Sequence, residues 1–107
     1  MKLGDARRIA LALPEAAEAP HFDFTSFRVR GKIFATAPPD GLHLHVFVDD
    51  DAREQALELH AEFIEKLWWG KKVVGLRVRL AGARTAVVRE LLQGAWRRKA
   101  PKSLVAA

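Results

Sequence analysis

Residues 26–48 constrain the fold most strongly, because they read as three short strands in direct succession. In the first strand, Phe27 and Val29 alternate with polar side chains, which is the two-residue period of a half-buried strand. The third strand alternates leucine and valine with His43, His45 and a phenylalanine in the same way. The predicted strands are residues 26–30, 33–37 and 42–48.

The connections between these strands are short and rich in glycine and proline. Gly31-Lys32 is just long enough for a tight hairpin, with Gly31 able to adopt a positive φ. Residues 38–41 read Pro-Pro-Asp-Gly, which is typical of a second turn. The whole stretch therefore predicts an antiparallel meander with one face available to cover a core.

Helical periodicity surrounds this meander. Apolar residues at helical spacing predict helices over residues 2–13, 52–60 and 84–99, and Asp50 or Asp51 is placed to cap the second of them. Residues 71–80 alternate again and predict a fourth strand. Residues 61–69 fit a helix, a loop or a strand, and of the adjacent tryptophans at their end one is expected in the core and the other near the surface.

Together these elements predict an α+β fold. The expected order is α-β-β-β-α-β-α, with an antiparallel sheet and its helices packed on one face. The 107 residues suit a single domain, and residues 102–107 look like a short tail. Residues 15–23 are expected to be a connector, with Phe22 entering the core.

Short motifs spread along the chain resemble the MmcQ/YjbR family. They are L-A-L-P at 11–14, P-H-F at 20–22, S-F-R-V-x-G-K-I-F-A-T at 26–36, W-G at 69–70 and A-W-R-x-x-A-P-K at 95–102. They occur in that family's order and span nearly the whole chain. The resemblance implies a small α+β domain similar to the CyaY and secretion-chaperone folds, and a DNA-binding function.

The charge is distributed unevenly. Residues 1–65 hold seven Lys/Arg against twelve Asp/Glu, whereas residues 66–107 hold eleven Lys/Arg against one acid, Glu90. Such asymmetry favours an anionic partner, nucleic acid above all, although a basic stretch can also be no more than solvated surface.

The basic residues gather on strands that are expected to share a sheet. Arg28 and Arg30 alternate with apolar residues, as Arg77 and Arg79 do, so all four are predicted to lie on the open face of the sheet. An exposed tryptophan beside two lysines would add a surface on which a base can stack. The predicted nucleic-acid-binding residues are Arg28, Arg30, Lys32, Trp69, Lys71, Lys72, Arg77 and Arg79.

Three histidines are candidate ligand contacts. His21 lies in the P-H-F motif, where it either contacts a ligand or ties the connector to the sheet by a hydrogen bond. His43 and His45 share one side of a strand and are expected to extend the basic face, making its charge depend on pH. No third ligand is evident at a telling spacing, so no metal site is predicted.

The chain lacks the residues of a recognisable catalytic centre. It has no cysteine, and neither Ser26 nor Ser103 lies in a nucleophile motif or beside a plausible base. Gly31-Lys32 lacks the rest of a phosphate-binding loop. We expect a protein that is not an enzyme and uses no cofactor.

We find no signal peptide, no long apolar run and no cysteine, which predicts a cytoplasmic protein that does not bind membranes. We expect it to be a monomer or a weak homodimer. The leading hypothesis is weakly sequence-specific binding of nucleic acid. The alternatives are a protein-interaction module, chaperone-like or homodimerising, and a small-ligand or metal sensor that uses the three histidines.

Overall fold

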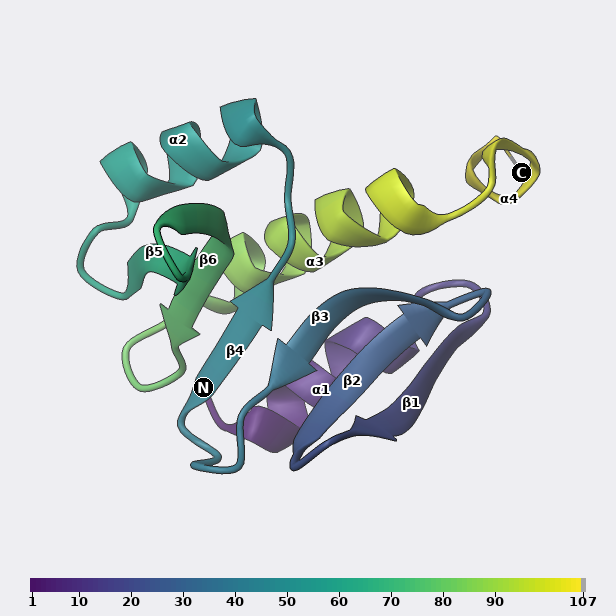
Figure 1. Cartoon of the computed structure of the whole chain (residues 1–107), viewed down its shortest axis with the longest axis horizontal. Coiled ribbons are helices and arrows are strands. Elements are labelled where there is room, and N and C mark those ends of the chain that lie inside the picture. Colours follow the sequence, from purple (N-terminus) through teal and green to yellow (C-terminus); the bar gives the residue numbers. More distant parts are fainter. Residues whose placement is uncertain (107) are drawn as a thin grey trace.

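A computed structural model describes residues 1–106 and contains one antiparallel sheet with helices packed against it. Figure 1 shows α1 and α3 behind the sheet and no helix in front of it. The sheet has six strands in the order β1-β2-β3-β4-β6-β5. The predicted α+β class and the helices on one face are confirmed, and two further strands extend the sheet at its edges.

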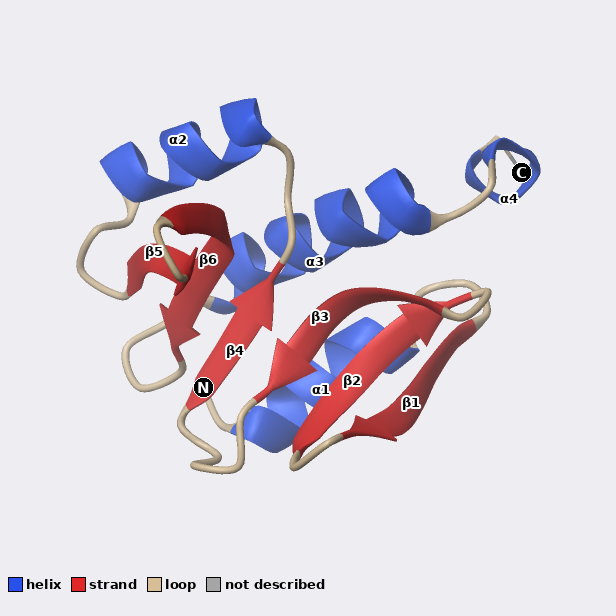
Figure 2. Ribbon diagram, viewed as in Figure 1, coloured by secondary structure: helices blue, strands red, loops and turns tan. Residues whose placement is uncertain are grey.

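Figure 2 distinguishes the helices from the strands and loops by colour. The strands are β1 (Ala16–His21), β2 (Phe24–Val29), β3 (Lys32–Ala37), β4 (His43–Val46), β5 (Ile64–Trp69) and β6 (Lys72–Arg79). The helices are α1 (Leu3–Leu11), α2 (Asp50–Leu59), α3 (Thr85–Lys99) and the short α4 (Lys102–Val105).

The core lies between the sheet and the helices. Alternate strand residues such as Phe27, Leu44 and Leu76 point inward and are almost fully buried. They meet Ala6 and Ala10 of α1 and the apolar side of α3, including Val88 and Leu92. The apolar residues whose alternation predicted the meander therefore lie on the face of the sheet that the helices cover.

The hairpin between β2 and β3 lies one residue earlier than the sequence predicted. Val29 pairs with Lys32, so the two turn residues are Arg30 and Gly31 and not Gly31-Lys32. Both turn residues have a positive φ, 50° for Arg30 and 78° for Gly31, as the twist of a two-residue hairpin requires. Arg30 tolerates this conformation while it forms an ion pair with Glu15.

Residues 15–23, expected to be a connector, form the edge strand β1. Its pairing with β2 runs from Ala16 opposite Val29 to His21 opposite Phe24. Phe22, expected in the core, occupies the turn after β1 with φ 57° and is 91% exposed. The sequence did not predict this strand because alanine and proline are uncommon in strands. Pro20 is tolerated here because an edge strand leaves some of its backbone amides without a partner strand.

The undecided stretch 61–69 contains strand β5, at the other edge of the sheet. The expectation that one of its two tryptophans anchors the core is wrong: Trp68 is 56% exposed and Trp69 is 79% exposed. An edge strand has a neighbour on one side only, and a bulge between Leu67 and Trp68 shifts the register there.

Smaller differences concern the ends of helices. Asp49, not Asp50 or Asp51, caps α2, because its side chain accepts a hydrogen bond from the Ala52 amide at 2.8 Å. Residues 102–105 of the predicted tail form α4, with Leu104 and Val105 packed against the core, whereas Ala107 lies outside the described residues. Within residues 1–106, no helix has the length and apolarity to span a bilayer.

Candidate functional site

A single row of residues crosses the uncovered face of the sheet, one from each strand. Their pairing in register places the side chains on the same side. In strand order the row is Ala19, Ser26, Thr36, His45, Arg77 and Glu65. Arg28 Nε donates a hydrogen bond to Ser26 Oγ at 2.8 Å, so Arg28 lies on this side as well. Arg28 and Arg77 therefore share one face of the sheet, as the sequence predicted.

The middle of this row is buried although no helix covers it. Ser26, Thr36 and His45 are 0%, 5% and 6% exposed. Ser26 donates its hydroxyl to the Ala19 carbonyl at 2.7 Å, and the ring of Phe24 lies 5.9 Å from that of His45. The side chains along the row therefore cover one another, and the centre of the face is closed to a ligand.

His45 is not the exposed, pH-responsive residue that the sequence predicted. Burial, with the positive charge of Arg77 and the neighbouring His43 as further causes, lowers the pKa of His45 to about 4. Within residues 1–106, the buried His45 Nε2 and Arg77 Nε have no hydrogen-bond partner. His45 is consequently neutral at physiological pH and adds no charge to the face.

The four arginines predicted to contact phosphates are already engaged within the chain. Arg30 forms a bidentate ion pair with Glu15, with nitrogen–oxygen distances of 2.6 and 3.0 Å. These hydrogen bonds from Arg30 hold the pKa of Glu15 below its ordinary value. Arg79 donates to the Glu62 carbonyl at 2.6 Å. Arg28 donates to the Pro20 carbonyl at 3.4 Å as well as to Ser26.

Arg77 is held between acidic side chains from two directions. Its guanidinium lies 3.4 Å from Glu65 and 3.8 Å from Asp40. Asp40 Oδ2 also lies 2.8 Å from His43 Nδ1. The pKa of Asp40 is lowered, first by the Leu42 amide that donates to it and then by His43. The two carboxylates therefore offset the positive charge of Arg77 on this face.

The three candidate histidines do not form one site. His43 and His45 are on β4, whereas His21 is on β1, three strands away in the sheet. His21 is half-buried and its ring packs edge-on against that of Phe22, with the centroids 4.9 Å apart. In the described part of the chain, no three His, Asp or Glu side chains are arranged to hold a metal ion.

The remaining predicted residues gather on the hairpin of β5 and β6. Trp69 pairs with Lys72, and Gly70 and Lys71 form the turn, in which Gly70 has φ 61°. Trp69, Lys71 and Lys72 are all exposed. Lys32, the last predicted residue, is exposed but stands apart at the hairpin between β2 and β3.

Two further residues of the β5–β6 hairpin were not predicted. Trp68 is exposed, and Lys66 Nζ lies 5.9 Å from the centroid of its indole ring. The bulge between Leu67 and Trp68 breaks the two-residue alternation of β5, so the sequence pattern did not mark these side chains. We call Lys66, Trp68, Trp69, Lys71 and Lys72 the hairpin cluster.

The fold and this surface define a small α+β domain with one antiparallel sheet, and comparison with known proteins identifies its family. The model of the YjbR family matches residues 11–98, so the chain belongs to the YjbR family. The crystal structure of Deinococcus radiodurans protein DR2400, described by the domain model DUF419, is similar with a TM-score of 0.77 and 24% sequence identity. The similarity covers 91% of this chain and 77% of that one, and it concerns the fold. No match was found among curated proteins.

Proposed function

We propose that this protein binds single-stranded nucleic acid through the hairpin cluster. The observation that carries the proposal is the concentration of two exposed tryptophans and three lysines on one β-hairpin. Within residues 1–106 none of these lysines forms an ion pair, whereas each of the four predicted arginines bonds to a carboxylate or a backbone carbonyl.

The chemistry of the hairpin cluster suits an unpaired strand. Adjacent residues of a strand point to opposite faces, so Trp68 and Trp69 offer a stacking surface on each side of the ribbon. A base stacked on an aromatic side chain contributes about 1–3 kcal/mol with little dependence on sequence. Lys71 and Lys72, at and beside the turn, are placed to contact the phosphates on either side of a base that rests on Trp69.

The proposal shifts the site from the sheet face to its edge. Lys72 lies five residues along β6 from Arg77, or about 16 Å at the rise of a strand. The hairpin cluster is therefore a separate surface from the row that contains Arg77. On this view the four arginines stabilise the fold through their contacts within the chain, and the lysines at the edge bind phosphate.

The test compares binding of a fluorescent oligothymidylate by the wild-type protein and three variants at low salt. Trp69→Ala is expected to weaken binding about tenfold through loss of stacking. Lys71→Gln with Lys72→Gln is expected to do the same through loss of two phosphate contacts. Arg97→Gln with Lys102→Gln removes the same charge from α3 and α4 and is the matched control.

The expected pattern is that both hairpin variants bind weakly while the control variant binds like the wild type. Equal weakening by the control would show that only net charge matters, and no binding by the wild type would exclude the proposal. Because Trp69 is 79% exposed, its replacement should leave the melting temperature unchanged, which separates loss of binding from loss of fold.

A second candidate function, self-association, is favoured by one observation. Phe22 is 91% exposed, and Leu42, on the loop before β4, is 61% exposed. Figure 1 shows the turn after β1 and the loop before β4 at the same end of the sheet. Light scattering that finds dimers, and only monomers for Phe22→Ser, would support this function; monomers at every concentration of the wild type would exclude it.

A further inference from the structure

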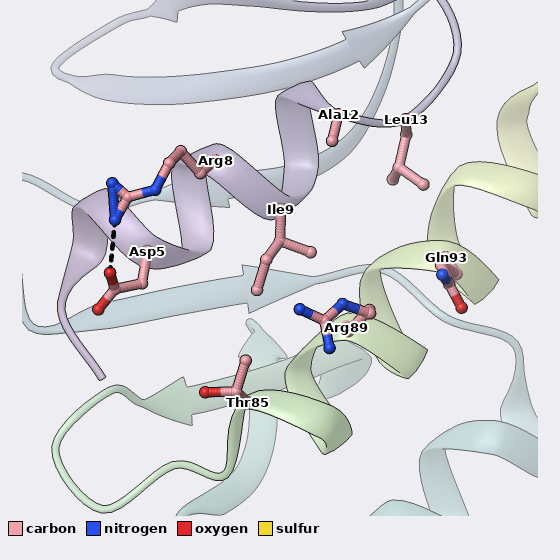
Figure 3. A pocket seen from close by; sticks show the side chains of 8 residues that line it. All are labelled: Asp5, Arg8, Ile9, Ala12, Leu13, Thr85, Arg89 and Gln93. Carbon is pink, nitrogen blue, oxygen red and sulfur yellow. Dashed lines mark hydrogen bonds and ion pairs between the residues drawn. The ribbon is translucent and has the colours of Figure 1, made fainter.

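A hollow lies on the helical side (Figure 1), away from the uncovered sheet face. It is an open cleft of about 670 Å³ between α1 and α3. Its volume falls within the range of about 300–1,000 Å³ that is typical of small-molecule sites. Figure 3 shows its lining side chains, which come from α1 and the turn after it on one wall and from α3 on the other.

Helical spacing explains the two walls. On α3 the lining residues are Thr85, Arg89 and Gln93, each one turn after the last, so they form one polar stripe. On the other wall Ile9 and Leu13 are one turn apart and half-buried. The polar stripe of α3 therefore faces a wall that is apolar at Ile9, Ala12 and Leu13 and charged at Asp5 and Arg8, an arrangement that suits an amphipathic ligand.

The charges in the cleft leave one cation available. Asp5 and Arg8 neutralise each other, with Arg8 Nη2 donating to Asp5 Oδ1 at 2.7 Å. Asp5 also accepts from the Lys2 amide at 2.9 Å, which holds it at the start of α1. Arg89 forms no ion pair within residues 1–106, and in Figure 3 its guanidinium extends from α3 toward Ile9 of α1.

We propose that this cleft binds a small organic carboxylate that carries an apolar group. The carboxylate pairs with Arg89, whose guanidinium offers two parallel N–H donors. The Thr85 hydroxyl and the Gln93 amide stand one turn away on either side and can complete the hydrogen bonding. The apolar group rests against Ile9 and Leu13, which removes their exposed surface from water.

The test uses 2-naphthoate as the probe and follows the backbone amides of the full chain by two-dimensional NMR. We expect shifts at residues 5–13 and 85–93, with a dissociation constant of about 1 mM, as is usual for a ligand of this size. The neutral analogue 2-naphthalenemethanol should bind about tenfold more weakly, because it cannot form a charged pair with Arg89.

Two variants and one control make the proposal falsifiable. Arg89→Gln should weaken naphthoate binding about tenfold, and Ala12→Trp should block the cleft without removing a charge. Arg97→Gln, two turns further along α3 and outside the cleft, should change nothing. Four results would each overturn the proposal. Two are equal binding of 2-naphthoate by wild type and Arg89→Gln, and equal binding of the neutral analogue by the wild type. The others are shifts outside α1 and α3, and no binding at 10 mM probe, about ten times the expected dissociation constant.

Discussion

Gly75 shows how a single missing side chain shapes the uncovered face of the sheet. A Cβ atom at this position would lie 2.6 Å from the Val46 carbonyl oxygen and 3.2 Å from Cδ1 of Phe47. The first contact is with the backbone of the neighbouring strand, which cannot move without disturbing the pairing of β4 with β6. Glycine is needed here for close approach and not for a positive φ.

We therefore predict that Gly75→Ala destabilises the fold by about 1–3 kcal/mol, the usual cost of overpacking. Gly94→Ala is the matched control. Gly94 is in α3, and a Cβ atom added there would meet no atom within 4 Å, so alanine should stabilise the helix by up to about 1 kcal/mol. Urea unfolding of both variants measures the two effects, and equal stabilities would contradict the prediction.

His45 makes the stability of the fold depend on pH. Its pKa of about 4 in the folded protein lies below the ordinary 6.5, so between these values the unfolded chain binds a proton that the folded protein does not. Stability should fall by about 1.4 kcal/mol per pH unit between pH 6 and pH 5 on this account. Three carboxyl groups, those of Asp5, Glu15 and Asp40, have lowered pKa values, and their contribution to stability is lost only at pH values below this range.

Urea unfolding at pH 5, 6 and 7 checks this prediction, with His45→Gln as the control in which the slope between pH 6 and pH 5 should flatten. A direct NMR titration of the His45 ring should show no protonation above pH 5. Titration near pH 6.5 in the folded protein would contradict the assignment.

At the scale of elements, α3 is tied to the start of the sheet by one buried side chain. Trp96 is 7% exposed and its Nε1 donates to the Pro14 carbonyl at 2.9 Å, joining α3 to the turn between α1 and β1. The A-W pair of the sequence motif at 95–102 therefore has a structural role. A partly buried hydrogen bond of this kind contributes about 0.5–1.5 kcal/mol to stability.

Trp96→Phe should for this reason destabilise the protein by about 1–3 kcal/mol, combining the lost hydrogen bond with a smaller ring. Thermal unfolding measures the loss. Trp69→Phe is the control, because Trp69 is exposed and should tolerate the change without loss of stability. Similar melting temperatures for the two variants would contradict the structural role of Trp96.

The elements that the sequence predicted well are those whose apolar residues face one side. The meander, β6 and α3 were predictable because alternation or helical spacing marks their buried faces. The edge strands β1 and β5 were not, because an edge strand buries little and leaves a weak pattern. The turn at Arg30 was misplaced by one residue because arginine rarely adopts a positive φ.

At the scale of the whole molecule, the sequence predicted the face on which two arginines lie but not the groups that pair with them. Sequence alternation correctly placed Arg28 and Arg77 on one face. It could not show that Glu15, Asp40 and Glu65, distant in the chain, lie beside arginines in the fold. Glu65, next to Lys66 in β5, pairs with Arg77, and within residues 1–106 none of the lysines of the hairpin cluster forms an ion pair.

This distribution predicts the salt dependence of binding to a single strand. Each phosphate contact contributes about −0.7 to the slope of log K against log salt concentration. Three lysines give a slope of about −2, and Lys71→Gln with Lys72→Gln should reduce its magnitude by about 1.4. A slope that is unchanged in this double variant would place the phosphate contacts on other cations.

The indole N–H signals of the three tryptophans, observed by NMR as oligothymidylate is added at low salt, test the hairpin proposal most directly. Trp68 and Trp69 are exposed on the hairpin cluster, whereas the Trp96 N–H is bonded to Pro14 within the protein and serves as the internal reference. We predict that the Trp68 and Trp69 signals shift or broaden and that the Trp96 signal stays in place. Unmoved Trp68 and Trp69 signals, with shifts at Arg28 and Arg77 or with none at all, would contradict binding by the hairpin.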